Sequence, residues 1–408
     1  MIDAIRGGRN PADPTPPELN VLILRSFAMA LSERLDSPST FSFAQARSLV
    51  GDLQKPNAKI YWIDFLSSIV TGHIAFHALY YLPKWYPDAT WLWPAMALAF
   101  FACVTLYMRS VMFIHELVHL PRDGFRGFRV AWNALCGIFL LLPSFLYHPH
   151  VDHHRRQHYG TEHDGEYLRL GAFRHGRWMI VGYIVQALIV PFLGIARFLL
   201  ISPICWVVPG AREWFHRHAS TMVVDPFYQR TDLTPRLRRL ILLQEGLCFA
   251  WCVWFLIRGG ITRNEPIDPI WFNGYAVAVT LMLVNEFRTL GAHRWTGDGK
   301  PMSFEDQLLD SVNYPHAPWI SELWGPVGTR YHALHHLFPS MPYHNLGIAH
   351  RRLMEGLPAN SPYRQTVAPS LSSELVALWK RSVGKPRSDG RSHSDVPAEV
   401  PADSQYAA

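Results

Sequence analysis

The chain has 408 residues, of which 49% are hydrophobic and only 17% are charged. Typical soluble domains carry about 25% charged residues, so this composition favours extensive apolar burial and excludes a wholly disordered chain. The five cysteines lie in apolar stretches without a CxxC pair, which argues against a disulfide scaffold and a thiolate metal site. The net charge of +6 is mildly basic, but no basic–aromatic pattern indicates nucleic-acid binding.

Long apolar runs begin after residue 59 and predict membrane-spanning helices. A helix needs about 20 apolar residues to cross the hydrocarbon core of a bilayer. Four runs meet this need, at 60–82, 90–114, 239–257 and 270–290. Two further apolar stretches, 130–147 and 178–208, are interpreted as interfacial or re-entrant helices, with two short spans as the alternative for the second. The predicted fold is an all-α integral membrane protein with four transmembrane helices plus interfacial helices.

The distribution of Lys and Arg predicts the orientation of these spans. The two predicted outer links, 83–89 and 258–269, contain Lys84, Arg258 and Arg263, whereas nearly all other basic residues lie in 1–59, 115–177, 209–239 and 291–390. Positive charge stays on the cytoplasmic side of a membrane, so we expect both termini to be cytosolic. The first residues lack the pattern of a signal peptide, and a bacterial inner membrane is the expected location.

Three parts are predicted along the chain. Residues 1–59 form a cytosolic N-terminal segment, and 60–355 form the membrane domain with a cytosolic histidine-rich cap. Residues 356–408 form a C-terminal segment, in which the stretch from about 383 is rich in Ser, Pro and Asp and reads as a disordered tail.

The most unusual feature of the sequence is its 21 histidines, many of which form three clusters. The clusters are HELVH (His115, His119), HVDHH (His150, His153, His154) and HALHH (His332, His335, His336). Residues three or four positions apart share one face of a helix, so each cluster can direct two or three imidazoles to one point. All three clusters fall on the predicted cytosolic side. The alternative, solvated or capping histidines, does not account for two HxxHH patterns in one chain.

The number of clustered histidines indicates two metal ions. His293, directly after the last span, adds a ninth candidate ligand, with interaction with the helix dipole as its alternative role. Neutral imidazole binds Fe, Zn, Cu and Ni, but one tetrahedral zinc takes four ligands at most. Eight or nine imidazoles therefore fit two ions with four or five ligands each. Open positions for dioxygen would favour iron.

These boxes resemble the integral-membrane fatty acid desaturase family. That family has one HxxxH and two HxxHH boxes split by membrane spans, and the stretch after His332, HALHHLFP, is similar to its third box. Ala292-His293 resembles an additional ligand of the stearoyl-CoA desaturase branch. The resemblance covers about residues 60–350.

The resemblance implies a non-haem di-iron centre, two Fe²⁺ ions with O₂ as co-substrate, that introduces a double bond into a fatty acyl chain. Carried over residue by residue, the implied ligands are His115, His119, His150, His153, His154, His293, His332, His335 and His336. The implied substrate is an acyl lipid, acyl-CoA or acyl-ACP within membrane lipid. No HPGG haem-binding sequence occurs, so we expect a separate electron donor of the ferredoxin, rubredoxin or cytochrome b5 type.

Several polar residues are candidates to support the metal ligands without binding metal. Thr289 stands where the stearoyl-CoA branch has a water-holding Asn, and Asn285 and Glu286 lie further back in the same predicted span. Intramembrane polar groups are functional candidates by default. Glu116, inside the first box, is expected to hold an imidazole N–H group, and Asp152, inside the second box, and Asp310 are weaker candidates for the same role.

The same residues are also compatible with other functions. A hydroxylase or a fatty acid decarboxylase on the same scaffold is the main alternative. HELVH also matches the HExxH motif of zinc metalloproteases, which would leave at least five clustered histidines unexplained. A non-catalytic lipid-binding protein is a third class. His148, His158 and His344 flank the boxes, and we expect hydrogen bonding rather than metal ligation from them.

Overall fold

The computed structural model describes residues 41–121, 123–170, 176–258 and 269–382. The described chain is nearly all helical, with three isolated β-bridges and no strand among the described residues. The predicted all-α architecture is therefore confirmed. The first 40 residues, the predicted C-terminal tail and the link that contains Arg263 lie outside the described residues.

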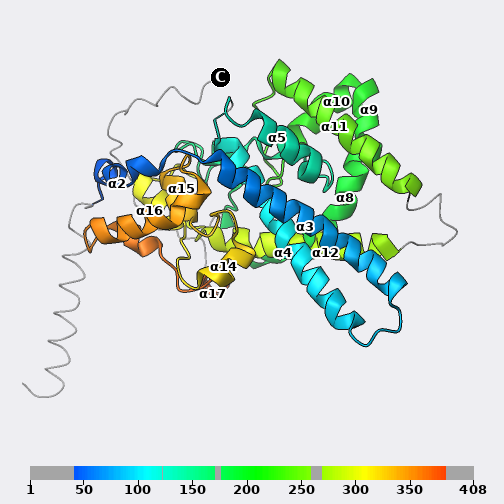
Figure 1. Cartoon of the computed structure of the whole chain (residues 1–408). Helices are drawn as coiled ribbons and strands as arrows, with labels where there is room; N and C mark the ends of the chain where they lie inside the picture. The colour runs from blue at the N-terminus through cyan, green and yellow to red at the C-terminus, as the bar shows by residue number, and fades with distance from the viewer. Residues whose placement is uncertain (1–40, 122, 171–175, 259–268, 383–408) are drawn as a thin grey trace, which may run out of the picture.

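Helices α3 (Ala58–Trp85) and α4 (Leu92–His119) form an antiparallel hairpin, which projects from the rest of the molecule in Figure 1. Asn57 caps α3, because its side-chain oxygen accepts a hydrogen bond from the Lys59 N–H at 3.1 Å. The two helices approach closely where Gly72 faces Tyr107. A Cβ atom at Gly72 would lie 2.8 Å from the Tyr107 ring, so only glycine permits this packing.

Helices α11 (Pro235–Leu256) and α12 (Pro269–Ala292) are the other two long helices. Thr234 caps α11 by accepting a hydrogen bond from the Leu237 N–H at 3.3 Å, and Pro235 occupies the first helical position, where no N–H is needed. Helix α12 packs against both α3 and α4. All four predicted spans are thus long helices.

The apolar stretch 178–208 is a series of short helices. They are α7 (Gly176–Val185), η5 (Gln186–Leu188), α8 (Val190–Ala196), the π-helical η6 (Arg197–Ile201) and α9 (Ser202–Val207). The last three together, Val190–Val207, are long and apolar enough to cross a membrane. The described residues therefore contain five candidate spans, one more than predicted, and the number that cross stays a prediction.

The stretch 130–147 forms only short pieces, which are not among the candidate spans of the described chain. They are α5 (Arg126–Trp132), the π-helical η2 (Asn133–Gly137) and η3 (Ser144–Tyr147).

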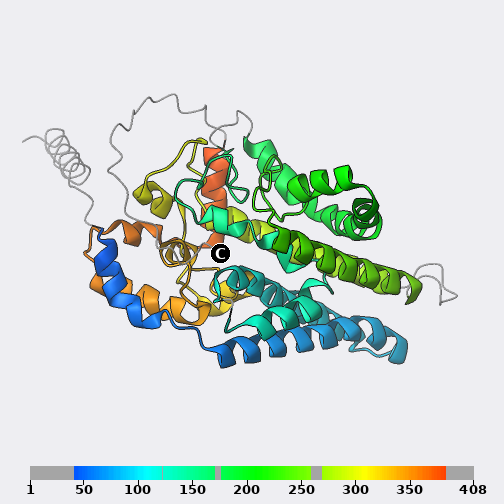
Figure 2. The same cartoon turned by 90° about the horizontal axis from the view of Figure 1, so that it is seen from above.

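Shorter helices cover one end of the long-helix bundle and form a cap, seen at the left of Figures 1 and 2. They are α2 (Phe43–Val50), η1 (Gly51–Leu53), α6 (His150–His153), α13 (Phe304–Asp310), α14 (Pro318–Trp324), α15 (His332–Leu337), α16 (Tyr343–Gly356), η8 (Pro362–Thr366) and α17 (Leu371–Arg381). Helix α10 (Pro209–His218) lies against α9 instead. The main hydrophobic core joins α3 and α4 to α15 and α16, so the cap and the bundle share one core.

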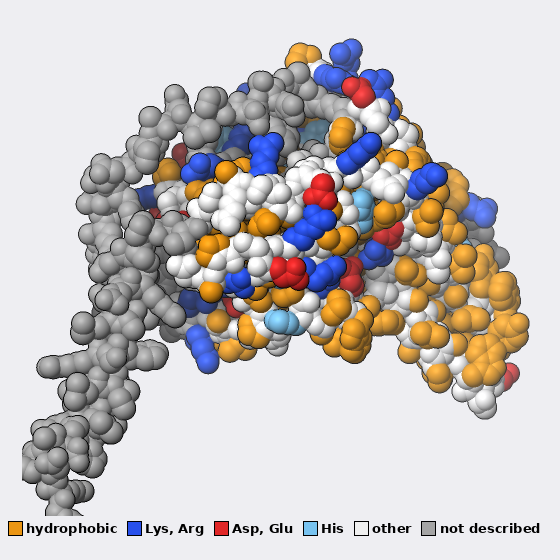
Figure 3. All heavy atoms as spheres, turned by 60° about the vertical axis from the view of Figure 1, so that its left-hand side comes forward, with side chains coloured by type: hydrophobic (Ala, Val, Ile, Leu, Met, Phe, Trp, Pro, Cys, Tyr) orange, Lys and Arg blue, Asp and Glu red, His pale blue; other side chains and the backbone are white. Residues whose placement is uncertain are grey.

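Large apolar side chains remain exposed on the long helices. Ile63 and Ile74 of α3, Trp93 and Leu98 of α4 and Val207 of α9 are each more than 60% exposed. In Figure 3 hydrophobic side chains dominate one end of the molecule, and charged side chains gather over the remainder of the face shown. Surfaces of this kind need an apolar environment, and a bilayer provides it.

A network of ionic side chains ties α3 and α4 to the cap. Arg109 of α4 donates to both carboxylate oxygens of Asp64 on α3, at 2.6 Å each. Its third contact is Glu322 of α14 at 3.1 Å, and Glu322 also binds Arg330 at 3.0 Å. The Tyr343 hydroxyl donates to Asp64 at 2.6 Å. The segments on either side of the third histidine box are therefore attached to the membrane hairpin.

Replacement of Arg109 should destabilise the protein, because Asp64 would lose its bidentate partner. Breaking a buried ion pair costs about 3–5 kcal/mol, and partial exposure of Arg109 reduces the expected loss to roughly 1–3 kcal/mol. Thermal unfolding of Arg109→Met in one detergent measures this loss. The control is Arg126→Met, which breaks an exposed pair with Asp123. Equal unfolding midpoints for the two variants would contradict the structural role of the network.

Candidate metal centre

The nine histidines predicted as ligands come together in two adjacent groups. The five-histidine group contains His115, His119, His150, His154 and His335, and the four-histidine group contains His153, His293, His332 and His336. Within each group, one nitrogen from every ring lies within 4.8 Å of the others. The second and third boxes each contribute to both groups, so the groups are neighbours and not separate sites.

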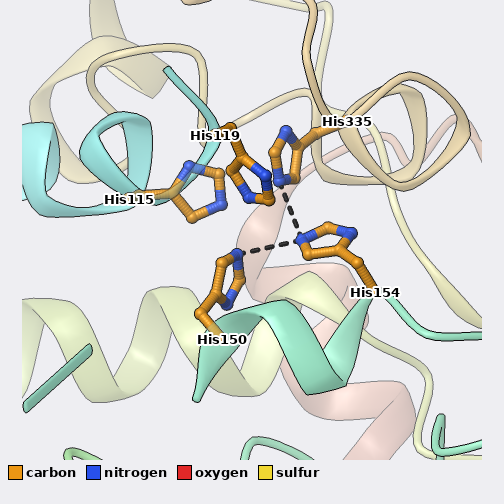
Figure 4. A group of neighbouring side chains, drawn as sticks. All are labelled: His115, His119, His150, His154 and His335. Atoms are coloured by element: carbon orange, nitrogen blue, oxygen red, sulfur yellow. Dashed lines mark hydrogen bonds between the residues drawn. The ribbon is translucent and has the colours of Figure 1, made fainter. Parts of the chain in front are cut away.

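In the five-histidine group the rings point toward one another from three helices (Figure 4). His154 is central, with its Nε2 atom 2.9 Å from Nε2 of His150 and 3.0 Å from Nε2 of His335. The ring centroids of His115 and His335 are 4.1 Å apart. The four-histidine group is similarly tight, because Nε2 of His293 lies 2.8 Å from Nε2 of His332 and 3.2 Å from Nε2 of His153.

The secondary structure around each histidine box determines where its imidazole rings lie. His115 and His119 occupy the last turn of α4, one above the other. Helix α6 spans only the second box. His293 follows the end of α12 and is fixed by a β-bridge to Ser311.

The third box lies on α15, and its position depends on Asn313. The Asn313 side chain accepts a hydrogen bond from the Leu334 N–H at 3.1 Å and donates to Thr366 at 2.9 Å. Asn313 is fully buried, so these contacts orient the start of α15 within the core.

The two groups have the properties of metal sites. Both nitrogens of His115 and the Nε2 atom of His119 are buried without a hydrogen-bond partner in the described structure. Such atoms are costly to bury unless something binds them. Two ligands at right angles, each about 2.1 Å from an ion, lie about 3.0 Å apart, which matches the observed Nε2 spacings. The residues present therefore fit a pair of ions with all-imidazole ligands.

Three carboxylates lie behind the imidazoles. Asp164 accepts from Nδ1 of His153 at 2.9 Å, and the Glu166 carboxylate lies 2.9 Å from Nδ1 of His150. Asp310 lies 3.3 Å from Nδ1 of His293. A proton held on Nδ1 leaves Nε2 free to bind metal, and contacts of this kind commonly orient ligand histidines.

Tyrosine hydroxyls contact one of these carboxylates, Asp310, and the His293 imidazole. The Tyr159 hydroxyl lies 2.8 Å from Nδ1 of His293 and donates to Asp310 at 2.8 Å, while Tyr167 donates to the other Asp310 oxygen at 3.1 Å. Asp310 also accepts from the backbone and side chain of Thr296. Its pKa is lowered despite burial, chiefly by the hydrogen bond to His293. Asp310 therefore stays ionised beside the four-histidine group.

Burial keeps most of these imidazoles neutral. It lowers the pKa of six of them outside the candidate spans: His150, His154, His293, His332, His335 and His336. His153 differs, because burial lowers its pKa but Asp164 more than offsets this effect, and the net shift is upward. Burial raises the pKa of Glu166 to about 7. Neutral imidazole is the form that binds metal.

The residues predicted to support the ligands have varied surroundings. Asp310 lies 3.3 Å from Nδ1 of His293. Glu116 instead accepts hydrogen bonds from the Tyr61 hydroxyl and the Tyr343 N–H, and so it faces away from the imidazoles. Asp152 contacts Arg155, His158 and Tyr228. The structure thus gives Glu116 and Asp152 partners other than the expected imidazoles.

Thr289 and Glu286 lie on α12 below His293. Thr289 accepts from Arg288 at 3.0 Å, and Glu286 is only 1% exposed. Neither residue has a direct hydrogen bond to a grouped imidazole in the described structure.

The other flanking histidines lie outside both groups. His158 is 3.4 Å from Asp152, and His344 accepts from the Asn57 N–H at 3.2 Å. His148 is likewise in neither group. His73 and His77, an i,i+4 pair on α3, serve packing, with His73 bound to Tyr107 at 2.7 Å.

Sequence reasoning missed Asp164, Glu166 and Tyr159. All three follow the second box within a short polar stretch, HYGTEHDGE at 158–166. A signal was available, because carboxylates close after a ligand cluster can fold back on it. Their pairing with particular histidines depends on the loop conformation, which spacing alone does not predict.

Comparison with known proteins places the chain in a family. The family model described as "Fatty acid desaturase" matches residues 89–367, and the chain belongs to that family. The predicted resemblance is confirmed, and with the five apolar helices it defines an integral, multi-pass membrane protein and an oxidoreductase of the desaturase and hydroxylase type.

Among characterised proteins, the chain is similar to "Ceramide hydroxylase" of Caulobacter vibrioides (strain NA1000 / CB15N). The two are 38% identical over 340 residues, which is 83% of this chain and 93% of the relative. No solved structure matches the chain significantly.

Loss of one grouped histidine should release metal. We expect His335→Ala to lose at least half of the metal bound by the wild-type protein, because it removes a ligand from the five-histidine group. Elemental analysis of detergent-purified protein measures this. The matched control is His344→Ala, a nearby histidine outside both groups, which should keep its metal. Full metal content in His335→Ala would contradict the assignment.

The stability of the metal-free protein should fall as pH falls below about 6.5, the pKa of an unfolded histidine. The unfolded chain then takes up protons that six folded imidazoles with lowered pKa values resist. Outside the candidate spans, His153 and Glu166, whose pKa values are raised, act in the opposite direction but are outnumbered by the six imidazoles. Thermal unfolding at pH 7.5, 6.5 and 5.5 tests this, and an unfolding midpoint that rises with acidification would contradict it.

Proposed function

We propose that this protein is an oxygen-dependent hydroxylase of a ceramide-type lipid, with two iron ions held by the nine grouped histidines. The observation that carries the proposal is the convergence of nine imidazoles, from four separate segments, into adjacent groups of five and four. The choice of reaction and lipid is supported by the similarity to a ceramide hydroxylase over most of both chains.

The donor set favours iron over the zinc of a protease. A catalytic zinc site has three protein ligands and an open position, whereas here His115 and His119 share one group with three more imidazoles. In the HExxH mechanism the Glu must face the metal as a general base. Glu116 is turned toward Tyr61 and Tyr343 instead. The protease reading therefore has no support from the geometry.

When bound, the two irons would supply the oxidant by activating O₂ with two electrons from a separate donor. In hydroxylation, one oxygen atom enters a C–H bond and the other leaves as water, with two electrons and two protons consumed. Asp164, Glu166 and Asp310 contact three of these imidazoles, those of His153, His150 and His293. Burial of the rings excludes bulk water from the reacting atoms.

Desaturation is the second candidate, supported by the family match and by the three-box pattern. Both reactions begin with removal of hydrogen from an unactivated carbon, and they differ in whether oxygen or a second hydrogen is then transferred. Decarboxylation has no specific observation in its favour.

The proposal extends to the electron donor, the membrane orientation and the domain limits of the protein. The electron donor is a separate ferredoxin-, rubredoxin- or cytochrome b5-type protein, because the sequence contains no HPGG haem-binding motif. We further propose that the cap and both termini lie on the cytosolic side of a bacterial inner membrane. The proposed division of the chain is an N-terminal segment at 1–59, a membrane domain at 60–355 and a C-terminal segment at 356–408.

Product analysis tests the proposed reaction. Purified protein, loaded with iron and given a reductase system, a saturated ceramide and ¹⁸O₂, should yield a hydroxylated ceramide that carries one labelled oxygen, measured by mass spectrometry. His335→Ala is the negative control. An unlabelled product with a new double bond would show desaturation and would contradict the hydroxylase proposal.

A further inference from the structure

Helix α12 carries a strip of polar side chains that descends from the metal centre into its membrane span. The strip contains Asn285, Glu286, Arg288 and Thr289, all within eight residues of His293. On an α-helix, Glu286 lies about 20°, Thr289 about 40° and Asn285 about 80° from the direction of His293. Arg288 leaves the helix about 140° from His293, and its long side chain returns to Asn285 and Thr289 through hydrogen bonds. At a rise of about 1.5 Å per residue, the strip extends roughly 6–12 Å from the histidine.

Hydrogen bonds organise the strip. The Arg288 guanidinium donates to the side-chain oxygen of Asn285 at 3.0 Å and to the Thr289 hydroxyl at 3.0 Å. No carboxylate lies within 4.0 Å of this guanidinium in the described part of the chain. Arg288 is therefore a cation within a candidate span whose only direct partners are neutral oxygens. A charge in this position is costly and indicates a functional partner.

Glu286 provides carboxylate oxygens, which are hydrogen-bond acceptors and complement the N–H donors of Arg288. Its side chain is buried, and both carboxylate oxygens are buried without a hydrogen-bond partner in the described part of the chain. Gln186 of η5, which packs against α12, is the neighbouring polar side chain. The strip thus offers N–H donors at Arg288 and oxygen acceptors at Glu286. Amides and hydroxyls have both functions, whereas methylene groups have neither.

Three of the four residues are partly accessible to a lipid, whereas Glu286 is buried beside them. Asn285, Arg288 and Thr289 are only partly buried within the protein, and α12 carries exposed apolar residues such as Phe287 beside them. The Arg288 charge also acts on Tyr147 and Glu166, and both of these residues border the five-histidine group. A molecule bound to the strip would therefore lie next to the metal centre.

An unbranched acyl chain would fit this strip poorly. Each polar group left without a partner against a methylene chain costs about 1–3 kcal/mol. A substrate oxidised in the middle of a long chain needs an apolar wall at this level of the span. A substrate whose amide and hydroxyl groups lie close to the reacting carbon would satisfy the same side chains.

We propose that Asn285, Glu286, Arg288 and Thr289 bind the amide and hydroxyl groups at the head of the lipid substrate, and that they direct oxidation to a carbon near that head. This inference rests on the proposed function and adds to it the recognition site for the lipid. In it, Arg288 donates to the amide carbonyl and Glu286 binds an N–H or hydroxyl. These residues position the substrate and do not touch the metal ions.

Binding to metal-free full-length protein tests this without dependence on turnover. The probe is a ceramide with a photoreactive diazirine on its acyl chain, competed with unlabelled ceramide. We expect Arg288→Met and Glu286→Gln each to weaken the competition on the order of tenfold to a hundredfold, since a hydrogen bond to a charged group is lost. Thr280→Val is the control and should compete like the wild-type protein, because the Thr280 hydroxyl donates to its own helix backbone at Ala276.

Two results would overturn the inference. One is unchanged ceramide competition in Arg288→Met and Glu286→Gln, with wild-type thermal unfolding midpoints showing that both metal-free variants fold. The other is competition by phosphatidylglycerol as strong as by ceramide, which would make Arg288 a general lipid-headgroup contact. Failure of this inference and failure of the proposed function give different results. Ceramide binding that depends on the strip, together with a desaturated product, would support the recognition site and contradict only the hydroxylation.

In the iron-loaded enzyme, the position of the new hydroxyl gives a second readout. Wild-type protein should place it within a few carbons of the amide group. Arg288→Met should raise KM more than it lowers kcat and should scatter the product over several carbons. A single mid-chain product from the wild-type enzyme would contradict the proposed recognition.

Discussion

The structure depends on holding nine imidazoles close together at one end of a membrane bundle. Rings from α4, α6, α15 and the residue after α12 must face one another with nitrogens about 3 Å apart. Without bound metal this arrangement is unfavourable, because each unpaired buried nitrogen costs about 1–3 kcal/mol. The surrounding fold must therefore supply the energy that keeps the rings in place. Metal binding would offset much of this free-energy cost, because the buried nitrogens would then have a partner.

Two sets of contacts meet this requirement. Near the rings, Asp164, Glu166 and Asp310 lie within 3.3 Å of the Nδ1 atoms of His153, His150 and His293 and leave the Nε2 atoms of these three rings facing inward. Further away, the Asp64–Arg109 pair and its contact with Tyr343 attach the segment after the third box to the membrane hairpin. Both sets join segments far apart in sequence, so the site and the fold are stabilised together.

Sequence periodicity predicted the long helices and the nine grouped histidines, because hydrophobic length and i,i+4 spacing are local properties. It did not predict the five short helices between 176 and 207, where prolines and π-helical turns interrupt an apolar stretch. Nor did it predict the partners of Glu116, because the contact with Tyr343 joins residues 227 positions apart. The carboxylates at 164 and 166 were missed for the same reason, since their roles depend on a loop that folds back. The choice between hydroxylation and desaturation depends on substrate position, which no motif encodes.

X-ray absorption at the iron edge, on wild-type protein purified in detergent, tests the central claim most directly. It reports both the identity of the metal and the atoms bound to it. We predict an iron edge with about two irons per chain, a first coordination shell of nitrogen and oxygen, and the outer-shell scattering that imidazole rings produce. Sulfur ligands, or a single zinc ion in place of iron, would contradict this account.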